Sequence, residues 1–228
     1  MIDFSIPPEL ESHRQSVTAF MNQYVYPNEN AMVEDEGLPA ELESELQRKV
    51  KTQGLWAPNL PREWGGMGIG FIGQALLNEI IGRSVIGPRI FGSAAPDAGN
   101  AELLIISATP QQKEEYLRPL AAGDVRSCFA MTEPEVAGSD PTGLRTTAEK
   151  EADEWVINGH KWFISGAIGS EFAIVMAVTD PGADAHARAS MILVPTNTPG
   201  FNIVRAVPVM GSGGVGGHCE IRFENCRV

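Results

Sequence analysis

The hydrophobic periodicity and the composition of the sequence change near residue 126, and this change constrains the fold more than any other feature. From residue 8 to about residue 118, apolar side chains recur at spacings of three and four, as amphipathic helices require. From residue 126 onward this period disappears, Thr, Val, Ile and aromatic residues become frequent, and turn formers follow at short intervals. We therefore predict an α+β chain, with an all-α domain over residues 1–125 and an antiparallel β-barrel domain over residues 126–228.

The first half of the chain contains residues that are typical of helix ends. Thr109 can cap a helix, Pro110 fits its first position, Gln112 stands three residues after the cap, and Gly123 can end the helix. The same periodicity predicts four other helices, at residues 9–24, 39–53, 71–81 and 97–107.

The second half is typical of short strands separated by Pro and Gly. Asn158-Gly159 readily adopts the two positive-φ positions of a type I′ turn, so we predict a hairpin whose strands cover residues 155–157 and 160–165. Further strands are expected at residues 128–131, 172–178, 190–194, 201–205 and 219–223. Many short antiparallel strands at this spacing indicate a small barrel or sandwich.

The charge balance is acidic, with a formal net charge of −12 over 228 residues. Proteins that neutralise nucleic-acid phosphates need clustered Lys and Arg, so we expect no nucleic-acid partner. An anionic cofactor or thioester would have to be held by local donors, such as backbone N–H groups, hydroxyls or single arginines.

The pattern contains neither an export signal nor a membrane span. The N-terminus, MIDFSIPPEL, has an acidic residue and two prolines where a signal peptide needs basic and then apolar residues, and the longest apolar run, residues 172–178, is too short to cross a bilayer. Neither a disulfide framework nor a zinc site is indicated by the three cysteines, Cys128, Cys219 and Cys226. We expect a cytoplasmic location, or the mitochondrial matrix or peroxisome if the source is eukaryotic.

A glycine pattern in the helical half imitates a nucleotide-binding loop. Gly68, Gly70 and Gly73 match G-x-G-x-x-G, but a Rossmann loop follows a buried strand, and here residues 59–66 precede it. We interpret the pattern as a glycine-rich bend that enters a helix. If the chain binds a flavin cofactor, it must therefore do so without a Rossmann fold.

The segment from Phe129 to Asp140 is a stronger candidate site. A strand with alternating large side chains leads into a loop that contains hydroxyls, Pro134 and Gly138. An isoalloxazine ring needs apolar surface against its face and hydrogen-bond donors along its polar edge, and both could come from this segment. An ordinary surface loop after a strand has the same composition, so the residues alone leave both interpretations open.

A second candidate lies in residues 161–165. Phe163 and Ser165 are two apart and so face one side of a strand, where an aromatic ring and a hydroxyl would address the same space. The alternative is an aromatic core contact beside an edge hydroxyl.

Together these residues resemble the acyl-CoA dehydrogenase family over nearly the whole chain. Five motifs occur in the family's order: Gly54-Leu-Trp-Ala-Pro58, Glu63-Trp-Gly-Gly66, Ala108-Thr-Pro-Gln-Gln-Lys113 with Tyr116-Leu-Arg-Pro119, Thr132-Glu-Pro134 to Gly138-Ser-Asp140, and Ile157-Asn-Gly159 to Ser165. The resemblance implies an N-terminal helical domain, a middle β-barrel and a C-terminal four-helix bundle. It also implies FAD between the middle and C-terminal domains, commonly across a subunit boundary.

The resemblance assigns roles residue by residue. Phe129 and Gly138 would belong to the flavin-lining segment, with Met131 and Thr132 nearest the ring and Ser139 where the cofactor meets the pantetheine arm of acyl-CoA. Another part of the ring would be covered by Phe163, Ile164 and Ser165, with Ser165 near flavin N5.

The chain also departs from the family pattern. Its loop, T-E-P-E-V-A-G-S-D, is one residue longer than the common T-E-P-G-A-G-S-D and resembles a branch with T-E-P-D-V-A loops, some of whose members carry a kinase-like domain. Phe163 stands where many relatives have Trp, and Ser165 where many have Thr. Acyl chain length is not indicated.

The family's reaction is α,β-dehydrogenation of an acyl-CoA, with a carboxylate as base and electrons passing through flavin to an electron-transfer flavoprotein. That carboxylate, and an arginine that contacts FAD, come from the C-terminal bundle, which we expect this chain to lack because it ends at Val228, so no catalytic residue is assigned. Glu133 and Glu135 are interpreted as solvated loop carboxylates. His160 and His218 are interpreted as surface residues without a metal.

Several functions stay open. The chain is either part of a dehydrogenase, working as a homo-oligomer or with a chain that supplies the C-terminal domain, or a non-catalytic remnant that binds flavin, acyl-CoA or a partner subunit. A flavin oxidase or monooxygenase is a third alternative within the same fold.

Overall fold

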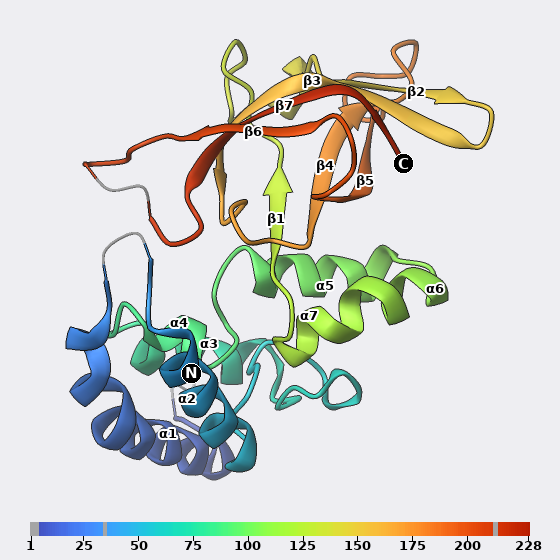
Figure 1. Ribbon diagram of the computed structural model, residues 1–228. Coiled ribbons are helices and arrows are strands. Elements are labelled where there is room, and N and C mark those ends of the chain that lie inside the picture. Colours follow the sequence, from blue (N-terminus) through green and yellow to red (C-terminus); the bar gives the residue numbers. More distant parts are fainter. Residues whose placement is uncertain (1–4, 34–35, 212–213) are drawn as a thin grey trace. The chain divides into compact units, whose positions relative to one another are not determined.

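The computed structural model describes residues 5–33, 36–211 and 214–228 (Figure 1). The chain divides into two compact units, Met1–Asp124 and Val125–Val228. No helix in the described part of the chain is both long enough and apolar enough to cross a membrane.

The first unit is helical, as predicted. The four expected helices are confirmed to within a few residues, and the first continues from α1 into a π-helical turn, Met21–Val25. The described helices are α1 (Pro8–Phe20), α2 (Ala40–Thr52), α3 (Gly70–Ile81), α4 (Gly87–Ile90), α5 (Asp97–Ser107), α6 (Pro110–Gln112) and α7 (Arg118–Ala122).

The predicted caps of the last helical segment are confirmed. Thr109 Oγ1 accepts from the Gln112 N–H at 3.2 Å, and Gln112 Oε1 accepts from the Thr109 N–H at 3.0 Å, which closes a capping box. A π-helical turn, Lys113–Leu117, joins α6 to α7, and Gly123 ends α7 at a φ of 75°.

The core of the helical unit forms around Phe20. Its ring lies 5.3 Å from Phe91 in an edge-on contact and 4.9 Å from Tyr24. Leu77 and Ile81 of α3 are also buried, so α1 and α3 present their apolar stripes to the same core.

The second unit is a curled, mixed sheet that forms a half-barrel (Figure 1). The order of its strands is β1-β4-β2-β3-β7-β6. The remaining strand, β5, lies off this path and pairs with β4. The strands are β1 (Ser127–Ala130), β2 (Thr147–Glu151), β3 (Glu154–Ser165), β4 (Phe172–Val178), β5 (Ala189–Pro195), β6 (Phe201–Ala206) and β7 (His218–Arg227). The helical-then-β class is confirmed, but the sheet is not purely antiparallel, because β1 and β4 pair in parallel.

The predicted hairpin at Asn158-Gly159 is wrong. β3 runs unbroken through both residues, and the turn lies earlier, at Ala152-Asp153, between β2 and β3. Gly159 serves close packing instead, since a Cβ there would lie 2.2 Å from Thr146 Oγ1. Strand β2 was missed because its sequence, TAEKE, has little apolar alternation.

The core of the β-unit contains all three cysteines. Cys128, Cys219 and Cys226 are thiols with no exposed surface, packed among side chains such as Ile157 and Ile221. Burial raises the pKa of the Cys226 thiol to about 11 and also raises that of Cys219. These cysteines behave as small apolar residues of the core.

Candidate functional site

The first predicted segment passes from β1 into an exposed loop. Phe129, Met131 and Thr132 are half-buried, whereas Gly138 and Ser139 are exposed. A Cβ on Gly138 would approach the Thr132 methyl to 3.2 Å, so the loop folds back closely on Thr132. The loop thus places apolar and hydroxyl groups next to one another.

The second segment is the end of β3. Phe163 is 41% exposed and Ser165 is exposed, while Ile164 between them is buried in the core. Phe163 has a φ of 53°, at a shift of the β3–β7 register between Lys161 and Ile164. Such a bulge redirects a side chain, and here the aromatic ring is left on the exposed side with Ser165. Ile164 could meet a ligand only through its backbone.

Two hydrogen bonds hold the two segments side by side. Lys161 Nζ donates to the Met131 carbonyl at 2.9 Å, and the Trp162 N–H donates to the Thr132 carbonyl at 3.0 Å. Met131 and Thr132 therefore lie beside the strand that carries Phe163 and Ser165.

Glu133 is not the solvated loop carboxylate that we predicted. It is 3% exposed, and it accepts from Lys161 Nζ at 2.9 Å and from the N–H groups of Arg145 and Thr146 at 2.8 and 2.9 Å. Burial acts to raise the pKa of Glu133, but hydrogen bonds from Thr146, Lys161 and Arg145 outweigh burial and lower it. The carboxylate holds the loop in place and is unsuited to take up a proton.

Lys161, the partner of Glu133, is fully buried. Burial lowers the pKa of its ammonium group, and Glu133 partly opposes that shift. We assigned no role to Lys161 from the sequence, where only its position directly before the apolar residues 162–164 could have indicated a buried partner.

The two histidines of the sheet, which we predicted to be surface residues, are half-buried, and each lies against a polar side chain. His160 Nε2 lies 2.9 Å from Glu220 Oε1. His218 Nδ1 lies 2.9 Å from Ser165 Oγ, so a histidine contacts a predicted site residue that only the cross-strand register brings near it.

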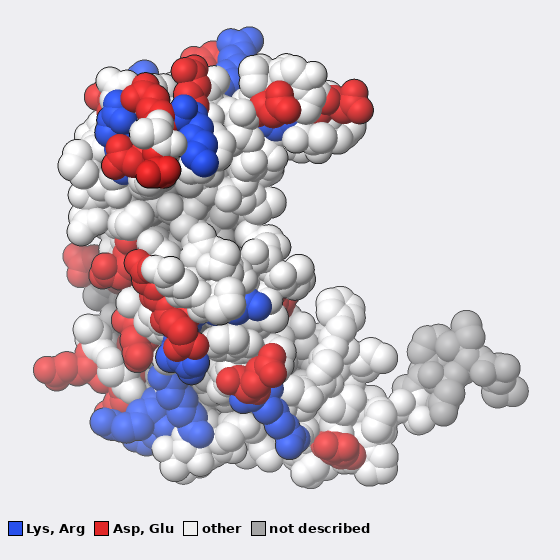
Figure 2. Space-filling model, turned by 90° about the vertical axis from the view of Figure 1, so that its right-hand side faces the viewer, with Lys and Arg blue, Asp and Glu red and all other residues white. Residues whose placement is uncertain are grey.

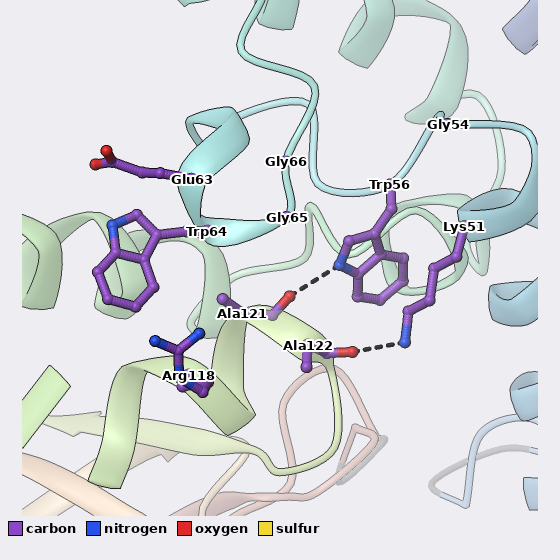
Figure 3. A pocket seen from close by; sticks show the side chains of 10 residues that line it. All are labelled: Lys51, Gly54, Trp56, Glu63, Trp64, Gly65, Gly66, Arg118, Ala121 and Ala122. Carbon is purple, nitrogen blue, oxygen red and sulfur yellow. Dashed lines mark hydrogen bonds between the residues drawn. The ribbon is translucent and has the colours of Figure 1, made fainter. Parts of the chain in front are cut away.

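The helical unit contains a pocket of about 380 Å³, which is an alternative candidate site (Figure 3). We call this pocket the hollow. The two indoles of Trp56 and Trp64 lie on either side of it, with the end of α7 between them. Trp56 Nε1 donates to the Ala121 carbonyl at 2.8 Å, and Lys51 Nζ donates to the Ala122 carbonyl at 2.6 Å while lying 4.4 Å from the Trp56 ring centroid.

These contacts use the polar groups of Trp56 and Lys51 within the protein. The motifs at residues 54–58 and 63–66 therefore hold the connection between α2 and α3 against α7. The glycine pattern at residues 68–73 is a bend that enters α3, as predicted, because α3 begins at Gly70.

The β-unit face fits the needs of a flavin ring. Phe163 supplies exposed aromatic surface, Thr132 and Ser165 supply hydroxyls that can serve the polar edge of the ring, and Gly138 keeps the loop close to Thr132. Basic side chains on the face drawn in Figure 2 lie next to acidic ones, which agrees with recognition by local donors.

Comparisons with known proteins agree with this fold. Residues 7–124 match the family model "Acyl-CoA dehydrogenase, N-terminal domain", and residues 128–226 match "Acyl-CoA dehydrogenase, middle domain". The chain is 40% identical, over its whole length, to Probable acyl-CoA dehydrogenase FadE2 of Mycobacterium tuberculosis, and covers 58% of that protein.

Two solved structures are similar. One, from Mycobacterium abscessus and assigned to the acyl-CoA dehydrogenases, has a TM-score of 0.91 and 38% identity, over 99% of this chain and 60% of that one. The other is a glutaryl-CoA dehydrogenase of Mycobacterium smegmatis in complex with FADH2, with a TM-score of 0.72 and 27% identity, over 98% of this chain and 54% of that one. This chain thus spans less than two thirds of each relative, and it belongs to the acyl-CoA dehydrogenase family.

Proposed function

We propose that the chain is the FAD-holding, acyl-CoA-binding portion of an acyl-CoA dehydrogenase. The observation that carries the proposal is that Met131 and Thr132 lie beside the strand that bears Phe163 and Ser165. Family membership supports the activity, and the FADH2 complex of the M. smegmatis relative supports the cofactor.

The chain's own residues would divide the binding between them. Phe129, Met131 and Phe163 offer apolar surface to the isoalloxazine ring, and Thr132 and Ser165 offer hydroxyls to its polar edge. Gly138 and Ser139, with the backbone of Ile164, complete the proposed set, and Ser139 also contacts the pantetheine arm of the acyl-CoA. When bound, FAD would accept the electrons removed from the acyl group.

No residue of the chain is assigned as the base that removes the α-proton. Glu133 is committed to its buried ion pair, and Glu135 is an exposed loop residue. We propose that the base comes from a C-terminal segment of a longer protein or from a second chain. The working protein would then be a homo-oligomer or a heteromer that passes electrons to an electron-transfer flavoprotein.

FAD titration of the apoprotein, followed by fluorescence quenching, tests the binding proposal. The double substitution T132A/S165A should weaken FAD binding by roughly tenfold to a hundredfold, because two hydrogen bonds of about 0.5–1.5 kcal/mol each are lost. A matched control, T179A/S190A, removes two mutually bonded hydroxyls, one directly after β4 and one on β5, and should leave FAD affinity unchanged. Equal affinity for all three proteins would refute the placement.

Anaerobic addition of an acyl-CoA separates a dehydrogenase portion from a non-catalytic binding protein. Loss of flavin absorbance only when a C-terminal portion is supplied supports the dehydrogenase. FAD and acyl-CoA binding without loss of absorbance in the reconstituted pair would favour the binding protein. Bleaching by this chain alone would contradict our view that it supplies no base.

A further inference from the structure

Ser165 has a partner that the family resemblance did not assign. Its Oγ lies 2.9 Å from His218 Nδ1, and the two residues face each other across the β3–β7 pair. The neighbouring pair, Ile164 and Cys219, is buried in the core, so the backbone that presents both polar side chains is fixed.

The imidazole of His218 is also held on its other side. The turn at residues 214–217 passes close to it, since a Cβ on Gly214 would lie 3.0 Å from His218 Nε2. Gly214, Gly216 and Gly217 all have positive φ angles, which glycine adopts without strain.

The same turn is tied to the chain that follows Ser165. The N–H groups of Gly166 and Ile168 donate to the carbonyls of Gly217 and Gly216, both at 2.8 Å. Since His218 directly follows this turn, these hydrogen bonds fix the His218 ring and the Ser165 hydroxyl relative to each other.

The proton count at this pair decides what Ser165 can offer to a ligand. A serine hydroxyl has one proton, and each imidazole nitrogen either donates or accepts. If Nδ1 of His218 carries no proton, Ser165 donates to it and presents only lone pairs outward. If Nδ1 carries a proton, Ser165 accepts it, and its own proton is free to point outward.

We propose that His218 is a positioning residue that donates its Nδ1–H to Ser165 Oγ and so makes Ser165 a hydrogen-bond donor toward the flavin. N5 of an oxidised flavin has a lone pair and no proton, so a hydroxyl beside it must donate. The inference rests on the proposed contact between Ser165 and the flavin, and it extends the site to a histidine on another strand.

Substitutions that mimic one ring nitrogen at a time test the proposal. In H218N the amide N–H occupies the place of Nδ1, whereas in H218Q it reaches the place of Nε2. FAD affinity should fall by about threefold to tenfold in H218F and H218Q, the value of one hydrogen bond, and recover in H218N. The visible absorption band of bound FAD should shift in H218F and return in H218N.

His160 provides the matched control, since it is a half-buried histidine on the same strand pair whose partner is Glu220. H160N should bind FAD like the parent protein. If S165A weakens FAD binding but H218F does not, the role of His218 is wrong and the proposed flavin contact stands. If S165A itself has no effect, the flavin contact of Ser165 is wrong.

A measurement without flavin tests the pair directly. Nitrogen-15 NMR of histidine-labelled apoprotein should show a protonated Nδ1 on His218, assigned by its loss in H218N, and its resonance should move in S165A. An unprotonated Nδ1, or a resonance that S165A does not change, would overturn the proposed donor role.

Discussion

The hollow in the helical unit and the face of the β-unit both consist of family motifs, but their polar groups are used differently. Around the hollow, Trp56 and Lys51 each donate to a carbonyl at the end of α7. On the β-face, Phe163 and Ser165 remain exposed, and the buried Glu133–Lys161 pair lies behind them. A motif side chain such as Trp56, which is buried and bonded internally, holds the fold, and motif side chains that stay exposed, such as Phe163 and Ser165, are candidates for binding.

The largest expected effect on stability comes from breaking the buried ion pair between Glu133 and Lys161. K161M leaves Glu133 buried without its cation and should lower the free energy of unfolding by about 3–5 kcal/mol, measured by urea denaturation. The double variant K161M/E133L replaces both charges with apolar groups and should recover much of that loss. A loss below about 1 kcal/mol in K161M would show that the ion pair is not the support of the loop.

An intermediate effect is expected in the wall of the helical hollow. G123A and G54A both place a Cβ at a positive φ, 75° and 68°, but only the Cβ at residue 123 meets another group, the Trp56 ring at 2.7 Å. Strain of about 1 kcal/mol should be common to both variants, and overpacking should add roughly 1–3 kcal/mol in G123A alone. Equal urea midpoints would mean that Trp56 moves freely and does not hold the wall.

A smaller effect concerns pH. The pKa of Glu133 is lowered in the folded protein, so the carboxylate contributes stability above the ordinary carboxyl pKa and loses it as pH falls through the lowered value. The stability advantage of the parent protein over K161M should therefore be present at pH 7 and shrink below about pH 4. Because both proteins contain the other carboxylates, the contributions of those groups to the pH dependence cancel in the difference between the two stabilities. A difference that is constant from pH 7 to pH 3 would contradict the lowered pKa.

Much of this organisation could be predicted from local patterns. The capping box at Thr109 and the glycine stop at Gly123 depend on neighbouring residues, and both were predicted correctly. Phe163 and Ser165 are both exposed, as the period of two predicts, but that period does not predict the bulge at Phe163.

The predictions were wrong where contacts with residues distant in the sequence determine the local structure or the burial of a side chain. Asn158-Gly159 has the sequence of a turn, but packing against Thr146 keeps Gly159 within a strand. Glu133 has the sequence of a solvated loop residue, but Lys161, 28 residues later, meets it in the interior. The contact between His218 and Ser165 spans 53 residues and depends on strand register, which one sequence does not specify.

The smallest expected effect on stability separates the two regions most clearly. S165A removes an exposed hydroxyl whose bond to His218 is worth about 1 kcal/mol or less, so its urea midpoint should stay close to that of the parent protein. The same substitution should weaken FAD binding, whereas G123A should lower stability and leave the FAD affinity of the folded protein unchanged. If S165A destabilised the chain as much as G123A does, the β-face would be structural like the wall of the hollow, and accessibility would not distinguish a binding motif from a folding motif here.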